Sequence, residues 1–438
     1  MTGGIDRRGL IAGGLAASLM AAPAFAQARR RVAASDKLQV GVIGCKGMGW
    51  SDLQAMMKGG DVVPVAIADV DARVLADRGA ELRKAGHSPR LYDDYRRMLD
   101  DPTVDAVIIA TPDHWHALQL MDALSAGKHA YCEKPLGNSI AECRAMVAAQ
   151  ARHGGVVQVG QWQRSARHWG DAIAHVQSGK VGRVRKVKAW AYMGWMKRVA
   201  PQPDGPAPAG VNYDRWLGPA PARAFNPNRF HFSWRWYWDY AGGLMTDWGV
   251  HLIDIARMGM KADVPRAVTS IGGPFGYPDS AMETPDTQTA IFDFGDHLLE
   301  WEHAVGIGQG PYGGRDHGVA FIGERGTVVV DRGGWQVIPE TSDGKPLSPA
   351  VPVTPGRDDG LVRHTADFVA CIKDRSRIPA CPIGEAAATA IVCQMGNVAY
   401  RTGRRVEWDA RAGRFGNDAG ANALITPRYR APYRLAAR

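Results

Sequence analysis

The sequence lacks the patterns of several common classes of protein. Its 438 residues carry a net charge of +9, but residues 1–37 hold six basic and two acidic side chains, and residues 411–438 hold six arginines and one aspartate. The body between them is therefore neutral, which does not indicate a groove for nucleic acid. The six cysteines show neither a CxxC pair nor a Cys/His spacing of a metal site, so no metal is predicted. The spacing leaves open whether Cys371 and Cys381, on either side of a predicted loop, form a disulfide.

The sequence also lacks an apolar run long enough to span a membrane. The one prominent apolar run covers residues 10–22, follows Arg7 and Arg8, and precedes small residues at 24–26. This order is typical of a twin-arginine export signal over residues 1–26. We therefore expect an exported, periplasmic protein that has no membrane span once the signal has been removed.

The body, which has no internal repeat, divides into two patterns. From 36 to 160, short β-branched runs alternate with amphipathic stretches, which predicts an α/β Rossmann domain with a doubly wound parallel sheet. From 161 to 410, we expect an α+β domain with a large, mostly antiparallel open sheet, followed by a basic tail over 411–438. The expected strands are residues 38–43, 62–68, 104–110, 128–132, 156–159, 184–192, 264–272, 286–294, 297–304, 317–323 and 326–330, and the expected closing helices are 361–374 and 384–401.

A glycine turn follows the first expected strand. The usual dinucleotide spacing is G-x-G-x-x-G, but Lys46 takes the place of the middle glycine, and Gly47 supplies flexibility one residue later. Asp69 ends the second strand, where a carboxylate accepts hydrogen bonds from an adenosine ribose and repels a 2′-phosphate. The alternative is a purely structural glycine turn. The pattern favours NAD as the cofactor, bound by Gly44, Lys46, Gly47, Met48, Gly49 and Asp69.

Two more strand ends carry distinctive motifs. Thr111-Pro112 follows the strand at 104–110, and Glu133-Lys134-Pro135 follows the strand at 128–132. A strand, a Glu-Lys-Pro turn and a helix in this position resemble the glucose–fructose oxidoreductase / inositol dehydrogenase / rhizopine (Gfo/Idh/MocA) family. The resemblance extends from Leu38 to about Asp409, with C-terminal signs in His364-x-x-Asp367-Phe368 and Ala399-Tyr400-Arg401-Thr402-Gly403-Arg404.

The resemblance implies three catalytic residues. Lys134 would contact both the nicotinamide ribose and the substrate hydroxyl, with the Lys134–Pro135 bond expected to be cis. His251 would take the hydroxyl proton, because imidazole titrates near neutral pH. Asp247 would orient the substrate or the imidazole, since an i, i+4 spacing places Asp247 and His251 on one helical face. A solvated helix face is the alternative interpretation of that pair.

Other residues are expected around the same site. The resemblance implies that Thr111, Pro112, His116, Glu133 and Gln161 line the cofactor side, although His116 could instead pack its own helix. Arg164 is expected near the substrate. The segment 230–240 is rich in aromatic rings that can stack on a sugar, and Trp236 and Tyr240 are the expected contacts. Because adjacent residues of a strand point to opposite faces, about half of these rings are expected in the core.

Together these features predict an exported NAD-dependent oxidoreductase that acts on a CH–OH group of a sugar, cyclitol or glycoside. Outside the cytoplasm there is no soluble NAD pool, so we expect a redox-neutral reaction on tightly bound cofactor. One alternative is an NAD-dependent glycoside hydrolase that works by oxidation, elimination, hydration and reduction. Another is a non-catalytic dinucleotide-binding sensor, against which Lys134, Asp247 and His251 argue. The resemblance also implies a homo-oligomer, either a dimer or a tetramer.

Overall fold

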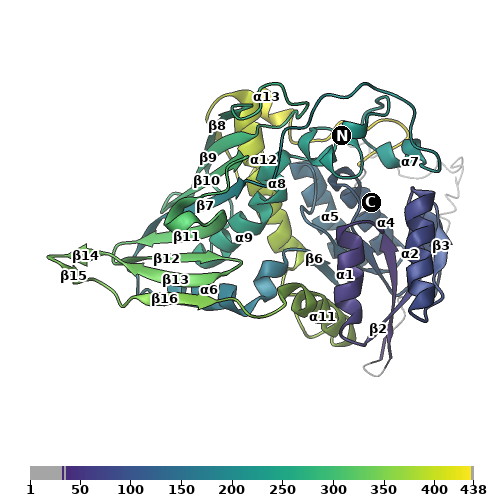
Figure 1. The fold of residues 1–438 in the computed structure, drawn as a ribbon, viewed down its shortest axis with the longest axis horizontal. Coiled ribbons are helices and arrows are strands. Elements are labelled where there is room, and N and C mark those ends of the chain that lie inside the picture. Colours follow the sequence, from purple (N-terminus) through teal and green to yellow (C-terminus); the bar gives the residue numbers. More distant parts are fainter. Residues whose placement is uncertain (1–31, 34–35, 436–438) are drawn as a thin grey trace, which may run out of the picture.

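The structure is a computed structural model that describes residues 32–33 and 36–435. The export signal expected over residues 1–26 therefore lies outside the described residues. Two units stand side by side in Figure 1, a smaller parallel sheet wrapped by helices and a large open sheet that ends in a protruding hairpin. No helix in the described part of the chain is both long and apolar enough to cross a membrane.

The first unit is the expected doubly wound parallel sheet. All six strands are parallel and the four central ones are almost entirely buried, which explains their continuous apolar runs. In spatial order the strands are β3 (Arg90–Tyr92), β2 (Val62–Ala68), β1 (Leu38–Ile43), β4 (Ala106–Ile109), β5 (His129–Cys132) and β6 (Val157–Val159). The helices are α1 (Met48–Met57), α2 (Ala72–Lys84), α3 (Tyr95–Leu99), α4 (Asp113–Ser125) and α5 (Ile140–His153).

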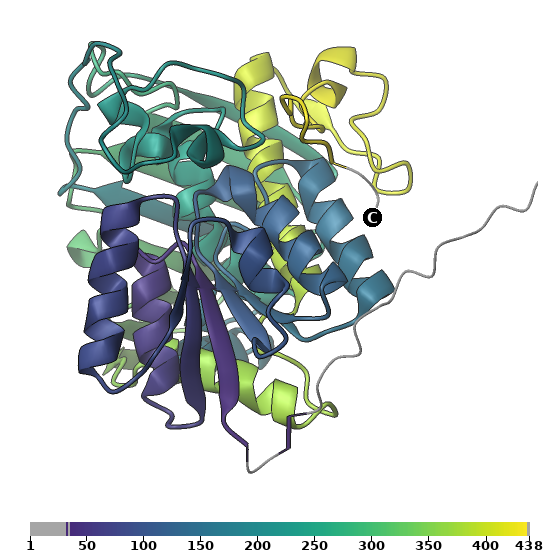
Figure 2. The same ribbon diagram turned by 90° about the vertical axis from the view of Figure 1, so that its right-hand side faces the viewer.

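Helices cover both faces of this sheet, as Figure 2 shows. Leu53 of α1 and Leu82 of α2 pack on one face, and Leu118 of α4 and Met146 of α5 pack on the other. The strand order reverses between β1 and β4, so the carboxyl ends of the central strands open into a crevice there. This edge of the sheet is where a ligand is expected.

The second unit is built on a nine-stranded sheet in which only the pairing of β7 with β10 is parallel. In spatial order the strands are β16 (Val351–Pro355), β13 (Gly334–Pro339), β12 (Gly326–Asp331), β11 (His317–Gly323), β7 (Val184–Met193), β10 (Leu298–Val305), β9 (Thr287–Asp293), β8 (Ala267–Gly273) and β17 (Val406–Glu407). The protruding hairpin is β14 (Thr341–Ser342) and β15 (Lys345–Pro346). The α-helices outside the first unit are α6 (Arg167–Gln177), α7 (Tyr213–Leu217), α8 (Gly243–Asp247), α9 (Gly249–Met260), α10 (Pro311–Gly314), α11 (Gly360–Lys373), α12 (Ile383–Thr402) and α13 (Ala419–Asn422).

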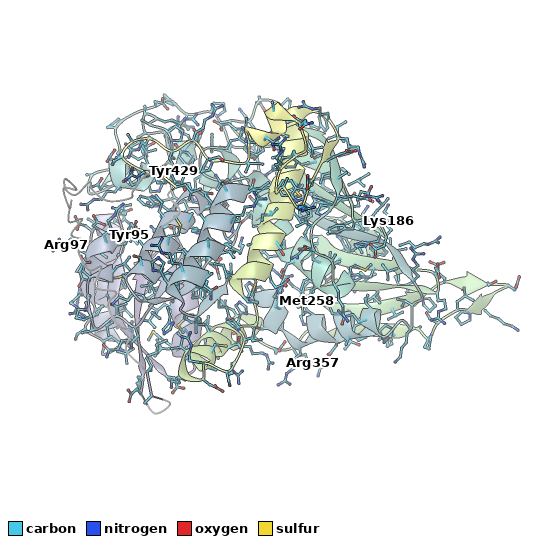
Figure 3. All side chains as sticks on the ribbon, turned by 180° about the vertical axis from the view of Figure 1, so that it is seen from behind. Tyr95, Arg97, Lys186, Met258, Arg357 and Tyr429 are labelled. Carbon is cyan, nitrogen blue, oxygen red and sulfur yellow. The ribbon has the colours of Figure 1, made fainter. Side chains whose placement is uncertain are left out.

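The C-terminal part of the chain ties the two units together. Helix α11 packs against α1 of the first unit, and α12 contacts both α5 and the large sheet. Figure 3 shows α12 running between the units, with the labelled Tyr429 on the side of Tyr95 and away from Lys186. The Tyr429 hydroxyl donates a 2.5 Å hydrogen bond to Glu142 of α5. The basic segment after residue 411 is thus packed on the protein as far as the structure describes it.

Most of the expected strands are present, but the aromatic segment is not a strand. It forms short 3₁₀ turns at Pro227–Arg229 and Ser233–Trp236, and His231 between them has a positive φ of 56°. The alternation of inward and outward rings therefore does not apply there. The six cysteines are all free and buried, so Cys371 and Cys381 are not joined in a disulfide.

Candidate functional site

A cavity of about 560 Å³ opens at the carboxyl edge of the parallel sheet and is closed on its other side by the second unit. The loops after β1, β2, β4 and β5 form one wall, where parallel strands direct their ends to the same place. Of the residues predicted from the sequence, those that line it are Gly44, Lys46, Gly47, Met48, Asp69, Thr111, Pro112, Glu133, Lys134, Asp247 and His251. The fold thus brings most of the predicted site together.

The glycine turn has the shape that a dinucleotide pyrophosphate requires. Gly44 has a φ of 84°, and a Cβ there would lie 2.8 Å from the carbonyl oxygen of Ala110. Gly49 does not face the cavity. A Cβ added at this position would lie 2.1 Å from the carbonyl oxygen of Gly44, so only a glycine allows α1 to approach the turn this closely. Helix α1 begins after Gly47 without any side-chain cap, so its first N–H groups are available to an anion. The turn fits the cofactor despite the missing middle glycine.

The acidic residue after β2 is held rigidly. Oδ2 of Asp69 accepts a 2.9 Å hydrogen bond from the backbone N–H of Cys45, and Oδ1 accepts one of 3.0 Å from that of Asp71. Burial raises the pKa of the Asp69 carboxyl, and these two bonds oppose that rise. The second unit reaches this end of the cavity, because His231 Nε2 lies 2.9 Å from Oδ2 of Asp71.

Lys134 and Asp247 meet in the wall of the same cavity. The ammonium group of Lys134 donates a 2.7 Å hydrogen bond to Oδ1 of Asp247 and another of 3.0 Å to its carbonyl oxygen. The guanidinium of Arg235 lies 3.6 Å from the same Oδ1. Burial alone would raise the pKa of the Asp247 carboxyl, but the two cations outweigh it and hold that pKa below its ordinary value. The Lys134–Pro135 peptide bond is cis.

His251 lies beside this pair in a buried position. Burial lowers the pKa of its imidazole well below 6.5, and the charges of Lys134 and Arg332 lower it further. Its Nδ1 is buried and forms no hydrogen bond with any described residue. The ring is therefore neutral at physiological pH and can accept a proton.

The helix expected to carry both Asp247 and His251 is interrupted. Helix α8 ends at Asp247 and α9 begins at Gly249, with Trp248 between them. Asp247 does not hydrogen-bond to the imidazole, because its carboxylate is engaged by Lys134 and Arg235. Of the two roles expected for Asp247, orientation of the imidazole is therefore not observed in this structure. The two side chains still line the same cavity.

Besides Gly49, five residues predicted for the site lie outside its wall. Arg164 donates hydrogen bonds of 2.7 and 2.8 Å to Asp254. Its charge is therefore paired within the protein and does not face the cavity. The ring nitrogens of His116 each lie 2.8 Å from a backbone carbonyl oxygen, so this residue braces the loops behind the cavity. The others, all buried away from the cavity, are Gln161, Trp236 and Tyr240.

The substrate contacts expected of Trp236 and Tyr240 must therefore be corrected. Both rings belong to the hydrophobic core of the second unit, because the 3₁₀ turn and the loop after it direct them inward. Phe232 and Trp234 of the same segment line the cavity instead. The aromatic composition located the correct segment, but the two rings expected to contact the substrate lie in the core.

Glu133 belongs to a buried acidic pair behind Lys134. Burial raises the pKa of Glu133 to about 7 although Lys134 is adjacent. Asp52 of α1 is completely buried, and neither of its carboxylate oxygens has a hydrogen-bond partner among the described residues. Burial and the charge of Glu133 raise the pKa of Asp52 well above its ordinary value. A protonated Asp52 is consistent with this environment.

Sequence reasoning missed several charged residues of the wall. Arg235 comes from the aromatic segment, Arg332 directly follows β12, and Asp113 begins α4. Burial raises the pKa of Asp113 well above its ordinary value. Arg332 is a single arginine after a predicted strand, and surface hairpins often carry such a residue. No sequence signal therefore marked Arg332 as part of the site.

Sequence comparison identifies known relatives of this fold and site. Residues 38–161 match an oxidoreductase family with an NAD-binding Rossmann fold, Gfo/Idh/MocA, and residues 176–274 and 357–435 match the C-terminal alpha/beta domain of that family. The uncharacterized oxidoreductase YrbE of Bacillus subtilis is 26% identical over 300 residues, which are 67% of this chain and 74% of that protein.

Two further proteins resemble the chain in part or in fold. Inositol 2-dehydrogenase 2 of Saccharopolyspora erythraea is 32% identical over 148 residues, 33% of this chain and 42% of its own length. The match thus covers less than half of that relative. A solved structure of a levoglucosan dehydrogenase in complex with NADH aligns with a TM-score of 0.66 at 20% identity, over 85% of this chain and 99% of the other.

Proposed function

Because the chain belongs to the Gfo/Idh/MocA family of NAD-binding oxidoreductases, we propose that it oxidises a secondary or anomeric hydroxyl of a sugar, cyclitol or glycoside. One observation carries the proposal. Lys134 from the Rossmann unit and His251 from the other unit line a single cavity that continues to the glycine turn and to Asp69. The related inositol dehydrogenase and the levoglucosan dehydrogenase of similar fold support a polyhydroxylated substrate.

The residues of the cavity wall have separate roles in holding the cofactor and in oxidising the hydroxyl. The α1 N-terminus, the glycine turn and Asp69 would hold the dinucleotide, and bound NAD would supply the two-electron acceptor. His251, which is neutral, takes the proton of the substrate hydroxyl. Lys134 donates a hydrogen bond to the same oxygen as negative charge develops on it. Asp247 positions the ammonium group of Lys134 rather than the imidazole.

We further propose that the reaction is redox-neutral, with the cofactor retained between half-reactions. This part depends on the export signal expected over residues 1–26, since an exported enzyme has no soluble NAD pool to exchange with. Oxidation of one carbohydrate would then be coupled to reduction of another. Oxidation, elimination, hydration and reduction of a single glycoside would also leave the cofactor unchanged overall.

Native mass spectrometry combined with absorbance tests the proposal. Protein from the exported fraction should carry one dinucleotide per chain, and its mass should show loss of the signal. Addition of an oxidisable carbohydrate should produce the reduced-nicotinamide absorbance band, and a second carbohydrate should remove it. Release of a free sugar from a glycoside without net redox change would favour the hydrolase instead. A bound cofactor that never changes redox state with any carbohydrate would identify a sensor and overturn the enzymatic proposal.

A further inference from the structure

The wall of the cavity contains an arginine, Arg332, that forms no direct ion pair with a carboxylate of the described residues, although the charges of Asp247 and Asp316 act on it from a distance. Arg332 follows β12, and its guanidinium carbon lies 4.8 Å from the ring centre of Trp162 and 4.5 Å from that of Trp248. Both rings line the cavity, and both lie within 6.5 Å of the His251 ring, at 6.4 and 6.3 Å between centroids. The guanidinium is therefore held close to the residue that we assign as the base.

The hydrogen bonds of Arg332 leave its outer edge unused. Its Nε donates a 3.3 Å bond to Oε1 of Gln163, and within the described residues no acidic side chain lies within 4 Å of the guanidinium. Arg164 provides a contrast, because its buried guanidinium is fully engaged by Asp254. Arg332 is only partly buried and lines the cavity, so its terminal nitrogens are available to an acceptor from outside the chain.

The neighbouring charges do not supply one. Lys134 and Arg235 both bind the carboxylate of Asp247, which is thus already shared by two cations. Asp113, also in the wall, is buried in a way that favours its neutral form. This end of the cavity therefore carries an excess of positive charge, which would favour an anionic ligand.

We propose that the substrate is a carbohydrate that bears a carboxylate, such as a uronic or aldonic acid, and that Arg332 binds this carboxylate through its terminal nitrogens. The inference rests on the proposed function and specifies its substrate class. A guanidinium offers two parallel N–H donors in one plane, which matches a planar carboxylate. The indole rings near Arg332 would fix that plane and limit the water that competes for it. Arg332 thus determines specificity, while Lys134 and His251 act at the hydroxyl.

Binding measurements on the cofactor-loaded protein test the assignment without requiring turnover. Binding is measured by calorimetry and by quenching of tryptophan fluorescence. The ligands are glucuronate, galacturonate, mannuronate and gluconate, together with the neutral hexoses and the hexose 6-phosphates of the same configurations. At least one acid should bind more than tenfold more tightly than its neutral counterpart. This preference should disappear in Arg332→Gln and fall strongly in Arg332→Lys, which keeps the charge but loses the paired donors.

Arg185→Gln is the matched control, because Arg185 lies on β7 with its side chain 71% exposed. It should retain the full preference for the acid. A preference that persists in both Arg332 variants, a preference for phosphates over carboxylates, or equal binding of acids and neutral sugars would each overturn the assignment. If the protein oxidises neutral sugars only, the proposed anionic substrate is wrong, but the proposed oxidoreductase function stands. Arg332-dependent binding of an acid without any redox change would support the anionic ligand and overturn the proposed oxidoreductase function.

Discussion

Nζ of Lys134 lies 2.7 Å from Oδ1 of Asp247, although 113 residues separate them in the chain. The contact joins the loop after β5 to the end of α8, so it couples the two units at the point where the cavity closes. Because Arg235 approaches the same carboxylate oxygen at 3.6 Å, Asp247 remains ionised in a buried site. The pair keeps the ammonium group of Lys134 fixed and directed into the cavity.

Replacement of Lys134 with Met should reduce kcat by about 10²–10³-fold, the usual loss when one donor to a developing oxyanion is removed. Binding of carbohydrate should weaken as well, since the same group contacts the substrate hydroxyl in our account. Steady-state kinetics over a range of substrate concentrations measures both effects, as kcat and KM. Lys186→Met, on an exposed lysine of β7 that pairs with Glu300 outside the cavity, is the control and should behave like the wild type. A fully active Lys134→Met protein would contradict the role assigned to Lys134.

Substitution of Asp69 should relax the preference for NAD over NADP. Asp69→Asn keeps an acceptor for only one of the two N–H groups, of Cys45 and Asp71, that the carboxylate now serves, and it removes the charge that repels a 2′-phosphate. We expect the NADP/NAD affinity ratio to rise roughly 10- to 100-fold, which corresponds to about 1.5–3 kcal/mol. Asp69→Ala should do the same and also weaken NAD. Cofactor titration by fluorescence checks this, and an unchanged ratio in both variants would make Asp69 purely structural.

The pH dependence of kcat/KM should report the environment of His251. The base must be unprotonated, and burial with the charges of Lys134 and Arg332 lowers its pKa well below 6.5. The value of kcat/KM should therefore stay level through neutral pH and fall only below pH 6.5, as the imidazole becomes protonated. Since a nearby cation disfavours the imidazolium form, Arg332→Gln should move the acid limb to higher pH. Arg185→Gln should leave the limb in place, and identical profiles for Arg332→Gln and wild type would exclude this coupling.

Asp52→Asn should stabilise the protein in a pH-dependent way. The pKa of Asp52 is raised in the folded state, so folding favours its protonated form, and stability is lost as pH rises toward that folded pKa. Asparagine cannot ionise, so the variant should gain stability over wild type as pH increases. The gain should reach about 1–3 kcal/mol at neutral pH and vanish near pH ~4. Thermal unfolding at several pH values measures this, and a difference that is constant with pH would contradict it.

The sequence was sufficient for the parts of the fold that depend on periodicity and turn chemistry. Mostly apolar runs such as 38–43 and 62–68 form largely buried parallel strands, and the Glu133-Lys134-Pro135 turn follows β5 as expected. Strands such as β13 and β16 were not predicted. Strand β16 is mostly exposed and rich in proline, so it lacks the apolar signal on which such a prediction depends.

The site was predictable where local motifs carry it and unpredictable where it depends on packing between the units. Gly44, Asp69 and Lys134 lie at strand ends that the pattern itself locates. Arg235 and Arg332 reach the cavity only because loops of the second unit fold over the first, which no local spacing encodes. Trp236 was misplaced for a different reason, because the segment around it adopts 3₁₀ turns and its ring lies in the core of the second unit.

The most direct measurement is the reduced-nicotinamide absorbance of cofactor-loaded protein mixed rapidly with an oxidisable carbohydrate, compared between wild type and His251→Ala. We expect both proteins to retain the dinucleotide, because in our proposal the glycine turn and Asp69 hold it and His251 does not. The absorbance should rise in wild type and should rise about 10²–10⁴-fold more slowly in the variant, as expected for loss of a general base. A rise at the wild-type rate in His251→Ala would contradict the convergence of Lys134 and His251 on one hydroxyl group.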